Sequence, residues 1–283
     1  MKKIKRALFV SALLTFALSC GEAVEQEQTS DENAGEMTEE NVEVDMQNES
    51  EFQLSLIIAN NIAAPVKLLT DMNQAGVDLY RDGVANPVES LENYQTADQK
   101  AIAFGVYGAD LSYISLYERH DEMADYLIAI RKLAEDLGLS SLFDQSSFED
   151  FERIKTDPDS VKMFIFSKYD SADEYLRAND RLVTACLVLT GGLIESLHLV
   201  SAQIEAGEAN KESYKIFLGQ KNTLKSLVEL FNNLENEGHA MNLKDDVQML
   251  LDTFEKLDSY DKFSKENVHS LHEAIDAVRD KLV

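Results

Sequence analysis

The apolar segment Arg181–Gly207 constrains the fold of this chain more than any other feature. A helix that is hydrophobic around most of its circumference lies inside protein or inside lipid. A membrane span needs roughly 20 predominantly apolar residues. Here polar residues, among them Glu195 and His198, interrupt the run, and a charge at bilayer depth costs about 2.5–3.5 kcal/mol. We therefore predict a central helix buried in a protein core.

The rest of the chain also has helical character. Apolar residues recur at helical spacing on both sides of the central segment, and no strand-like alternation persists. With 283 residues and 45% hydrophobic content, the chain can bury a sizeable core. We predict an all-α fold with a single domain at residues 51–283. About seven or eight helices, among them 65–82 and 211–236, pack around the central helix at about 181–206.

The N-terminus has the pattern of a targeting segment. Lys2, Lys3, Lys5 and Arg6 precede the short apolar stretch Ala7–Leu18, which is too short for a stable span. The stretch ends at Ala17-Leu18-Ser19-Cys20 and resembles a bacterial lipoprotein signal. That resemblance implies a signal peptide at residues 1–19 and a lipid such as palmitate on Cys20. An ordinary secretory signal cleaved near Cys20 is the alternative.

Residues 20–50 are strongly acidic. Positions 21–50 hold eleven Asp or Glu residues and no Lys, Arg or aromatic residue, so we predict a disordered tether. Removing the four basic residues of 1–19 changes the formal charge from −26 to −30. Because nucleic-acid affinity comes mainly from Lys and Arg on phosphates, we exclude nucleic-acid binding. Gly21 and the acidic run resemble outer-membrane and surface-export signals, respectively.

Two polar faces are candidates for ligand binding. Tyr107, Asp110, Tyr113 and Tyr117 form one stripe of a helix predicted to begin at a capping box at Thr96. They either pack at a core edge or form the floor of a ligand pocket. Glu195 and His198 form the second face, and a buried Glu195 must be paired or protonated. Glu195 is either bonded to a Tyr, Arg or Lys of a neighbouring helix or it binds a ligand or metal.

Metal sites and enzyme motifs receive little support from the sequence. Two Glu-x-x-His steps, Glu195/His198 and Glu266/His269, have the spacing found in di-iron bundles. The second step faces away from the apolar stripe of its helix, so the two cannot share a metal. His269 and His272 offer only a two-ligand surface site. With no catalytic motif present, we expect no enzyme, no metal and no cofactor.

Three stretches resemble an uncharacterised family of all-helical lipoproteins from Bacteroidetes. They are Phe104–Tyr113, Ala129–Leu139 and Leu189–Leu197, and the likeness covers about residues 60–235. The resemblance implies a helical fold and an envelope address but no activity. An aromatic residue often stands in that family where this chain has His198, so a metal site shared by the family is not expected there.

We therefore expect a cell-envelope lipoprotein of the outer membrane, either periplasmic or exposed at the cell surface. It is attached to the membrane through the lipid on Cys20. Its folded domain is expected to be a non-enzymatic binding or scaffolding module with an envelope protein as partner. The alternative is a small-ligand carrier or sensor, with a pocket between the Tyr107/Asp110/Tyr113/Tyr117 face and the Glu195/His198 face.

Overall fold

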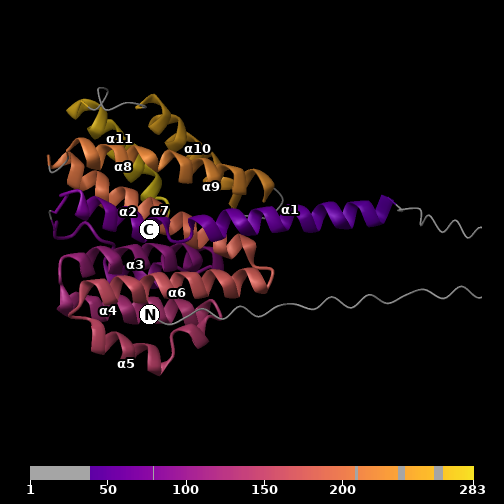
Figure 1. Ribbon diagram of the computed structural model, residues 1–283, viewed down its shortest axis with the longest axis horizontal. Coiled ribbons are helices and arrows are strands. Elements are labelled where there is room, and N and C mark those ends of the chain that lie inside the picture. The colour runs from indigo at the N-terminus through magenta and orange to yellow at the C-terminus, as the bar shows by residue number, and fades with distance from the viewer. Residues whose placement is uncertain (1–38, 79, 208–209, 235–239, 258–263) are drawn as a thin grey trace, which may run out of the picture. The chain divides into compact units, whose positions relative to one another are not determined.

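The computed structural model describes residues 39–78, 80–207, 210–234, 240–257 and 264–283 (Figure 1). These residues form eleven α-helices and two short 3₁₀ helices, without a strand. The helices are α1 (Glu39–Asn61), α2 (Ala64–Gln74), α3 (Ala97–Leu116), α4 (His120–Asp136), α5 (Gln145–Ile154), α6 (Pro158–Ala178), α7 (Leu182–Glu205), α8 (Lys211–Gly219), α9 (Lys221–Asn233), α10 (Ala240–Lys256) and α11 (Lys265–Arg279). The 3₁₀ helices are η1 (Val88–Asn93) and η2 (Ser140–Leu142). The predicted all-α class is confirmed.

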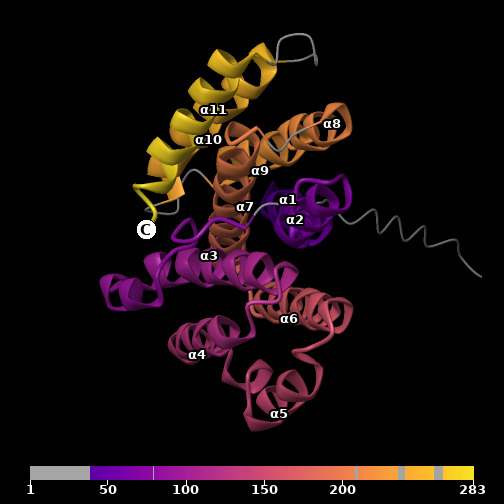
Figure 2. The same ribbon diagram turned by 90° about the vertical axis from the view of Figure 1, so that its left-hand side faces the viewer.

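Helix α7 is the centre of the domain. It contacts α2, α3, α6, α9 and α11, and Figure 2 shows α10 and α11 on one side of it with α3, α4, α5 and α6 on the other. Every side chain from Ala185 to Ile204 is buried except that of His198, which is partly exposed. By length and composition alone, α7 and Ser50–Gln74 are apolar enough to cross a membrane, but 89% of the α7 window is buried in this structure. The predicted buried central helix is confirmed.

The most extensive helix contact is that between α3 and α7, and glycines on both helices permit it. A Cβ atom at Gly105 would overlap the carbonyl oxygen of Val188, and one at Gly191 would overlap the carbonyl oxygen of Ile102. Since both obstacles are backbone atoms, neither can move aside as a flexible side chain would. The two glycines therefore let the helix backbones touch where α3 crosses α7.

Two predicted helices differ in length from the observed ones. The helix expected at 65–82 ends at Gln74, because Gly76 takes a φ of +87° and Val77 donates to the carbonyl of Met72 at 3.0 Å. This glycine-based hydrogen-bond pattern closes a helix C-terminus. The helix expected at 211–236 is instead α8 and α9, because Gln220 donates to Phe217 three residues back and interrupts the regular bonding. More helices are thus present than the seven or eight expected.

The N-terminal part of the chain is described only from Glu39. A compact unit spans Val44–Val283, close to the predicted domain at 51–283. Helix α1 begins at Glu39, inside the range 20–50 for which the sequence predicts a disordered tether. The predicted signal peptide at 1–19 and the lipidated Cys20 lie outside the described residues.

Candidate functional site

Polar side chains line the contact between α7 and α11, and we name this set the polar seam. Residues three and four apart share a helix face, so each helix contributes one stripe beside its apolar residues. Partners run in opposite directions, from Glu195 with Arg279 to Glu205 with His269, so the helices are antiparallel. The members of the seam are Glu195, His198, Ser201 and Glu205 on α7 and His269, His272, Asp276 and Arg279 on α11.

The inner end of the polar seam is an ion pair. Arg279 donates from Nε to Glu195 Oε2 at 2.6 Å and from Nη2 to Glu195 Oε1 at 2.9 Å. This two-bond geometry fixes both side chains and strengthens the interaction. Glu195 is completely buried and Arg279 nearly so. Of the two alternatives for Glu195, the bond to a basic residue of a neighbouring helix is confirmed.

Asp110 on α3 is a second buried carboxyl group beside this ion pair. Burial, followed by the negative charge of Glu195, raises the pKa of Asp110 well above its usual value. Asp110 Oδ2 accepts from the backbone N–H of Asn86 at 3.2 Å, while Oδ1 is buried without a donor. The raised pKa favours the protonated, neutral form of Asp110 beside the Glu195–Arg279 ion pair. Two acids and one arginine are then electrically balanced in the core.

The predicted tyrosine face is covered by the protein itself. Tyr107 donates to the carbonyl of Pro87 at 3.0 Å, and the hydroxyl of Tyr113 accepts from the backbone N–H of Arg81 at 2.8 Å. Tyr117 accepts from Gln203 at 2.6 Å. The segment that follows α2 and runs past η1 to α3 therefore lies across the face that the sequence suggested as a pocket floor.

At the middle of the polar seam, two histidines meet one carboxylate. His198 Nδ1 lies 2.6 Å from Asp276 Oδ1, and His272 Nε2 lies 3.4 Å from Asp276 Oδ2. The two imidazole rings are stacked with their centroids 5.9 Å apart. His272 Nε2 also lies 3.3 Å from Glu205 Oε2. We name His198, His272 and Asp276 the His–His–Asp cluster; one ligand atom from each lies within 4.8 Å of the other two.

Burial and charge determine the protonation of the cluster. Burial lowers the pKa of His272, which favours its neutral form. Burial opposes ionisation of Asp276, but the hydrogen bond and charge of His198 outweigh it and lower the pKa of that carboxyl group. A neutral imidazole beside a carboxylate is the form in which both groups bind metal ions.

An open pocket of about 350 Å³ borders the cluster. Its wall is formed by residues 81–85 and Pro87, by His198 and Ala202 of α7 and by His272 and Arg279 of α11. Of the six residues predicted to bind a ligand, only His198 is part of this wall among the residues that the structure describes. Polar groups from three segments that are distant in sequence nevertheless converge here and reach solvent.

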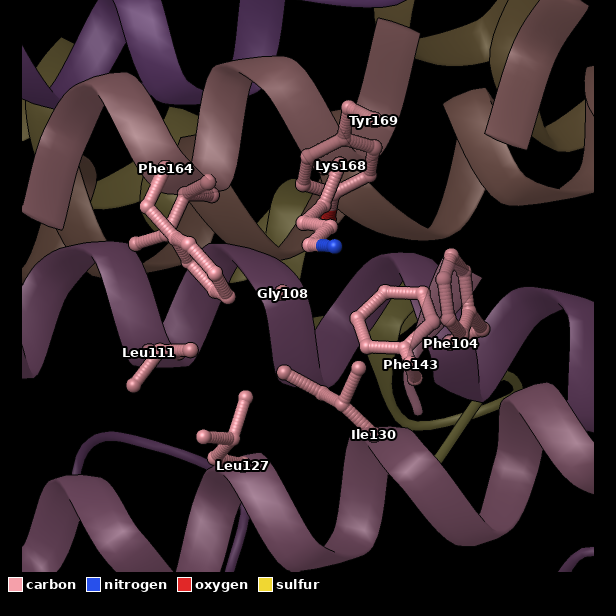
Figure 3. Close-up of a pocket in the computed structure, with 10 residues that line it drawn as sticks. Phe104, Gly108, Leu111, Leu127, Ile130, Phe143, Phe164, Lys168 and Tyr169 are labelled. Carbon is pink, nitrogen blue, oxygen red and sulfur yellow. The ribbon is translucent and has the colours of Figure 1, made fainter. Parts of the chain in front are cut away.

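A second cavity is apolar and nearly filled. It lies between α3, α4 and α6, where Figure 3 shows Phe104, Phe143 and Phe164 around the amine of Lys168. Its volume is about 20 Å³, room for little more than one water molecule. The Lys168 amine donates to the carbonyl of Leu142 at 2.6 Å and to Ser147 at 2.8 Å. This cavity is a small packing defect beside the Lys168 amine and is too small to be a ligand pocket.

Sequence reasoning identified Glu195 and His198 but missed their partners Asp276 and Arg279. The available signal was the second stripe of α11, at spacings of three and four residues from His269. The exposed position predicted for His269 is confirmed. His272, however, faces His198 and Asp276 and does not form a surface pair with His269.

Comparison with known proteins adds no relative. No protein-family model, curated protein or solved structure matches this chain.

Proposed function

We propose that this protein is an envelope lipoprotein whose helical domain binds a small ligand in the pocket between residues 81–87, α7 and α11. The observation that carries this proposal is the meeting of polar side chains from three distant segments at an open pocket of about 350 Å³. Binding pockets combine concave shape with a few converging polar groups. The protein acts by binding and not by catalysing a reaction.

The envelope address is supported by the N-terminal sequence. Basic residues, the short apolar stretch Ala7–Leu18 and Cys20 stand in the order of a lipoprotein signal. Lipidation at Cys20 would attach the domain to the outer membrane, on its periplasmic or its outer side. The acidic residues that follow would separate the domain from the membrane surface.

The anchor is tested by metabolic labelling with a palmitate analogue in the source bacterium. The wild-type protein is expected to take up the label and Cys20→Ala to lose it. Cys186→Ala is the matched control because Cys186 is the only other cysteine and is buried. Label that persists in Cys20→Ala, or an unlabelled wild-type protein, would contradict the anchor.

The pocket is tested by native mass spectrometry of the protein purified gently from its own envelope. An additional mass that disappears on denaturation is expected. Arg81→Ala should weaken its retention, because Arg81 is part of the pocket wall. Arg153→Ala is the control, since Arg153 lies on the exposed face of α5. A protein without additional mass, or equal retention in both variants, would contradict ligand binding at this pocket.

Binding of an envelope protein partner is the second candidate function. Phe52 and Leu56 stand one turn apart on α1 and are 56% and 40% exposed. Exposed apolar side chains that cluster in this way are typical of interaction surfaces. Cross-linking in cells should lose a specific product in Phe52→Asp/Leu56→Asp but keep it in the control Met163→Asp, where Met163 is an exposed apolar residue of α6. Equal cross-linking in both would count against a partner on α1.

A further inference from the structure

We propose that the His–His–Asp cluster binds a divalent transition-metal ion of the zinc type, with Glu205 as a fourth ligand. The inference names the class of ligand for the pocket proposed above and rests on that proposal. It does not depend on the lipid anchor.

The first support is the spacing of the ligand atoms. Zinc ligands lie about 2.0–2.2 Å from the ion, which places them roughly 3.3–3.6 Å apart in a tetrahedron. His272 Nε2 lies 3.4 Å from Asp276 Oδ2 and 3.3 Å from Glu205 Oε2. His198 Nδ1 and Asp276 Oδ1 are closer, at 2.6 Å, and a small rotation of either side chain separates them. The distances between the ligand atoms of the cluster are therefore close to those of a tetrahedral zinc site.

The second support is the hydrogen bonding of His198. Its Nε2 lies 3.2 Å from the carbonyl oxygen of Val84. A carbonyl oxygen only accepts, so Nε2 carries the hydrogen. Nδ1 lies 2.6 Å from the carboxylate of Asp276, where it either donates a hydrogen or, without one, presents the lone pair that binds a metal ion. Two acceptors at this distance require a proton or a metal ion between them.

His272 repeats the same pattern from the other helix. Ser201 Oγ donates its one hydrogen to the carbonyl of His198 at 3.0 Å, so it accepts from His272 Nδ1 at 2.8 Å. The lone pair of His272 Nε2 then points toward the oxygens of Asp276 and Glu205. His269 Nδ1 pairs with the other oxygen of Glu205, Oε1, at 2.5 Å, and a cation would occupy the position among His272 Nε2, Asp276 Oδ2 and Glu205 Oε2.

The outer contacts also match those of a metal centre. Metal-binding histidines usually donate their second ring N–H to a carbonyl or other acceptor, which fixes ring orientation and tautomer. Val84 has this role for His198, and Ser201 has it for His272. The ligands themselves stand on two long helices, which hold them more rigidly than loops would.

Charge near the cluster favours a cation over an anion. The guanidinium of Arg279 is already paired with Glu195 through two bonds. Asp276 and Glu205 place two carboxylates beside the histidines of the cluster, and Arg81 is the other basic residue of the pocket wall. Imidazole nitrogen with carboxylate oxygen suits zinc and its neighbours in the first transition row. Magnesium prefers an all-oxygen octahedral shell.

The test uses the full chain in detergent at pH 7.5, after a chelator has removed bound metal. Zinc chloride is titrated into the protein, and isothermal calorimetry measures the heat of binding. We expect one ion per chain, and cobalt(II) should give the visible absorption of a four-coordinate N/O site. Magnesium chloride should give no binding heat. His272→Gln and Asp276→Asn are each expected to weaken zinc binding by at least about tenfold.

Two further variants keep the test informative if a ligand variant unfolds. Ser201→Ala keeps all ligands but removes the acceptor for His272, and it should weaken zinc binding by about tenfold or more. Ser270→Ala is the control on the same helix, because Ser270 is exposed and outside the cluster; it should bind zinc as the wild type does. Circular dichroism verifies the helical fold of each variant.

Three results would overturn the metal site. The first is that no zinc binds at concentrations up to about 100 μM, because a weaker Kd would not retain a resident ion. The second is that zinc binding survives His272→Gln, Asp276→Asn and Ser201→Ala. The third is that cobalt gives the spectrum of an octahedral site and that the variants leave this spectrum unchanged. If zinc fails but an organic mass is retained from the envelope, the pocket proposal stands without the metal. If neither is found, both proposals fail.

Discussion

Glu195 and Asp110 are two carboxyl groups in the core beside a single arginine, Arg279, but only Glu195 is hydrogen-bonded to it. Glu195 receives both nitrogen donors of Arg279, while Asp110 receives a backbone N–H of Asn86 and a raised pKa. Because the interior penalises charge, one negative charge for one positive charge is the stable arrangement. The two acids should therefore respond differently to removal of their charge.

Glu195→Gln should destabilise the fold severely. The substitution removes the charge that pairs with a buried guanidinium, and breaking such a pair costs about 3–5 kcal/mol. The measurement is urea unfolding at pH 7.5. Glu92→Gln is the control because Glu92 pairs with Lys132 at the exposed surface, where a change within about 0.5 kcal/mol is expected. Equal effects in the two variants would show that the buried pair contributes nothing particular.

Asp110→Asn should be tolerated, and its relative stability should depend on pH. The folded state keeps a proton on Asp110 that the unfolded state releases, because burial and Glu195 raise its pKa. Wild-type stability therefore falls as pH rises from the usual value for Asp, near 3.8, toward the raised value. Asn keeps an acceptor and a donor at this position without a charge.

The stability of Asp110→Asn relative to wild type should accordingly increase through that window. Urea unfolding at several values between pH 4 and pH 8 measures it, with Asp82→Asn as an exposed control. Glu195 on α7 and Arg279 on α11 influence the pKa of Asp110. The wild type and Asp110→Asn must therefore both keep Glu195 and Arg279 in these measurements. A difference that stays constant across this range would mean that Asp110 is ionised in the folded state.

At the scale of the helices, the crossing of α3 and α7 depends on two glycines. Gly191→Ala would push a methyl group into the carbonyl oxygen of Ile102, and overpacking of this kind costs about 1–3 kcal/mol or more. We expect a clearly lowered melting temperature. Gly219→Ala is the matched control, since nothing lies near its added methyl group at the end of α8. That variant should be neutral or stabilised by up to about 1 kcal/mol, and similar losses in both would reject the close crossing.

Sequence patterns predicted the helices better than their ends. The apolar run at 181–206 and the capping box at Thr96 correspond closely to α7 and the start of α3. Gly76 and Gln220 lie where α2 and α8 end, although apolar periodicity alone would have continued both helices. Apolar spacing records which face is buried, whereas a helix end depends on local backbone geometry at one residue.

The candidate site was only half predictable for a different reason. Glu195 and His198 attract attention because they are polar residues in an apolar run. Asp276 and Arg279 lie in an ordinary amphipathic helix and gain significance only when α11 packs antiparallel to α7. That register is decided by contacts some 80 residues apart in sequence, which no local pattern contains. The tyrosine face was covered for the same reason, because a distant segment lies across it.

For the whole molecule, the excess of negative charge is the dominant electrostatic feature. The chain has 52 acidic and 26 basic residues, so its acidic residues outnumber its basic residues two to one. Self-repulsion of a large net charge destabilises a compact state, and dissolved salt screens exposed charges beyond about 8–10 Å. Surface pairs such as Lys100–Asp136 and Lys225–Glu255 are screened as well, but each contributes at most about 1 kcal/mol.

We therefore expect added sodium chloride to stabilise the domain. The melting temperature at pH 7.5 should rise by several degrees between 20 mM and 300 mM salt, in keeping with a gain of about 1 kcal/mol or more. The control is the same titration near pH 4.4, the isoelectric point of the sequence, where little net charge remains to be screened and the rise should largely vanish. A melting temperature that falls with salt at pH 7.5 would contradict this expectation. It would show that the attraction within surface ion pairs exceeds the repulsion among the excess acidic residues.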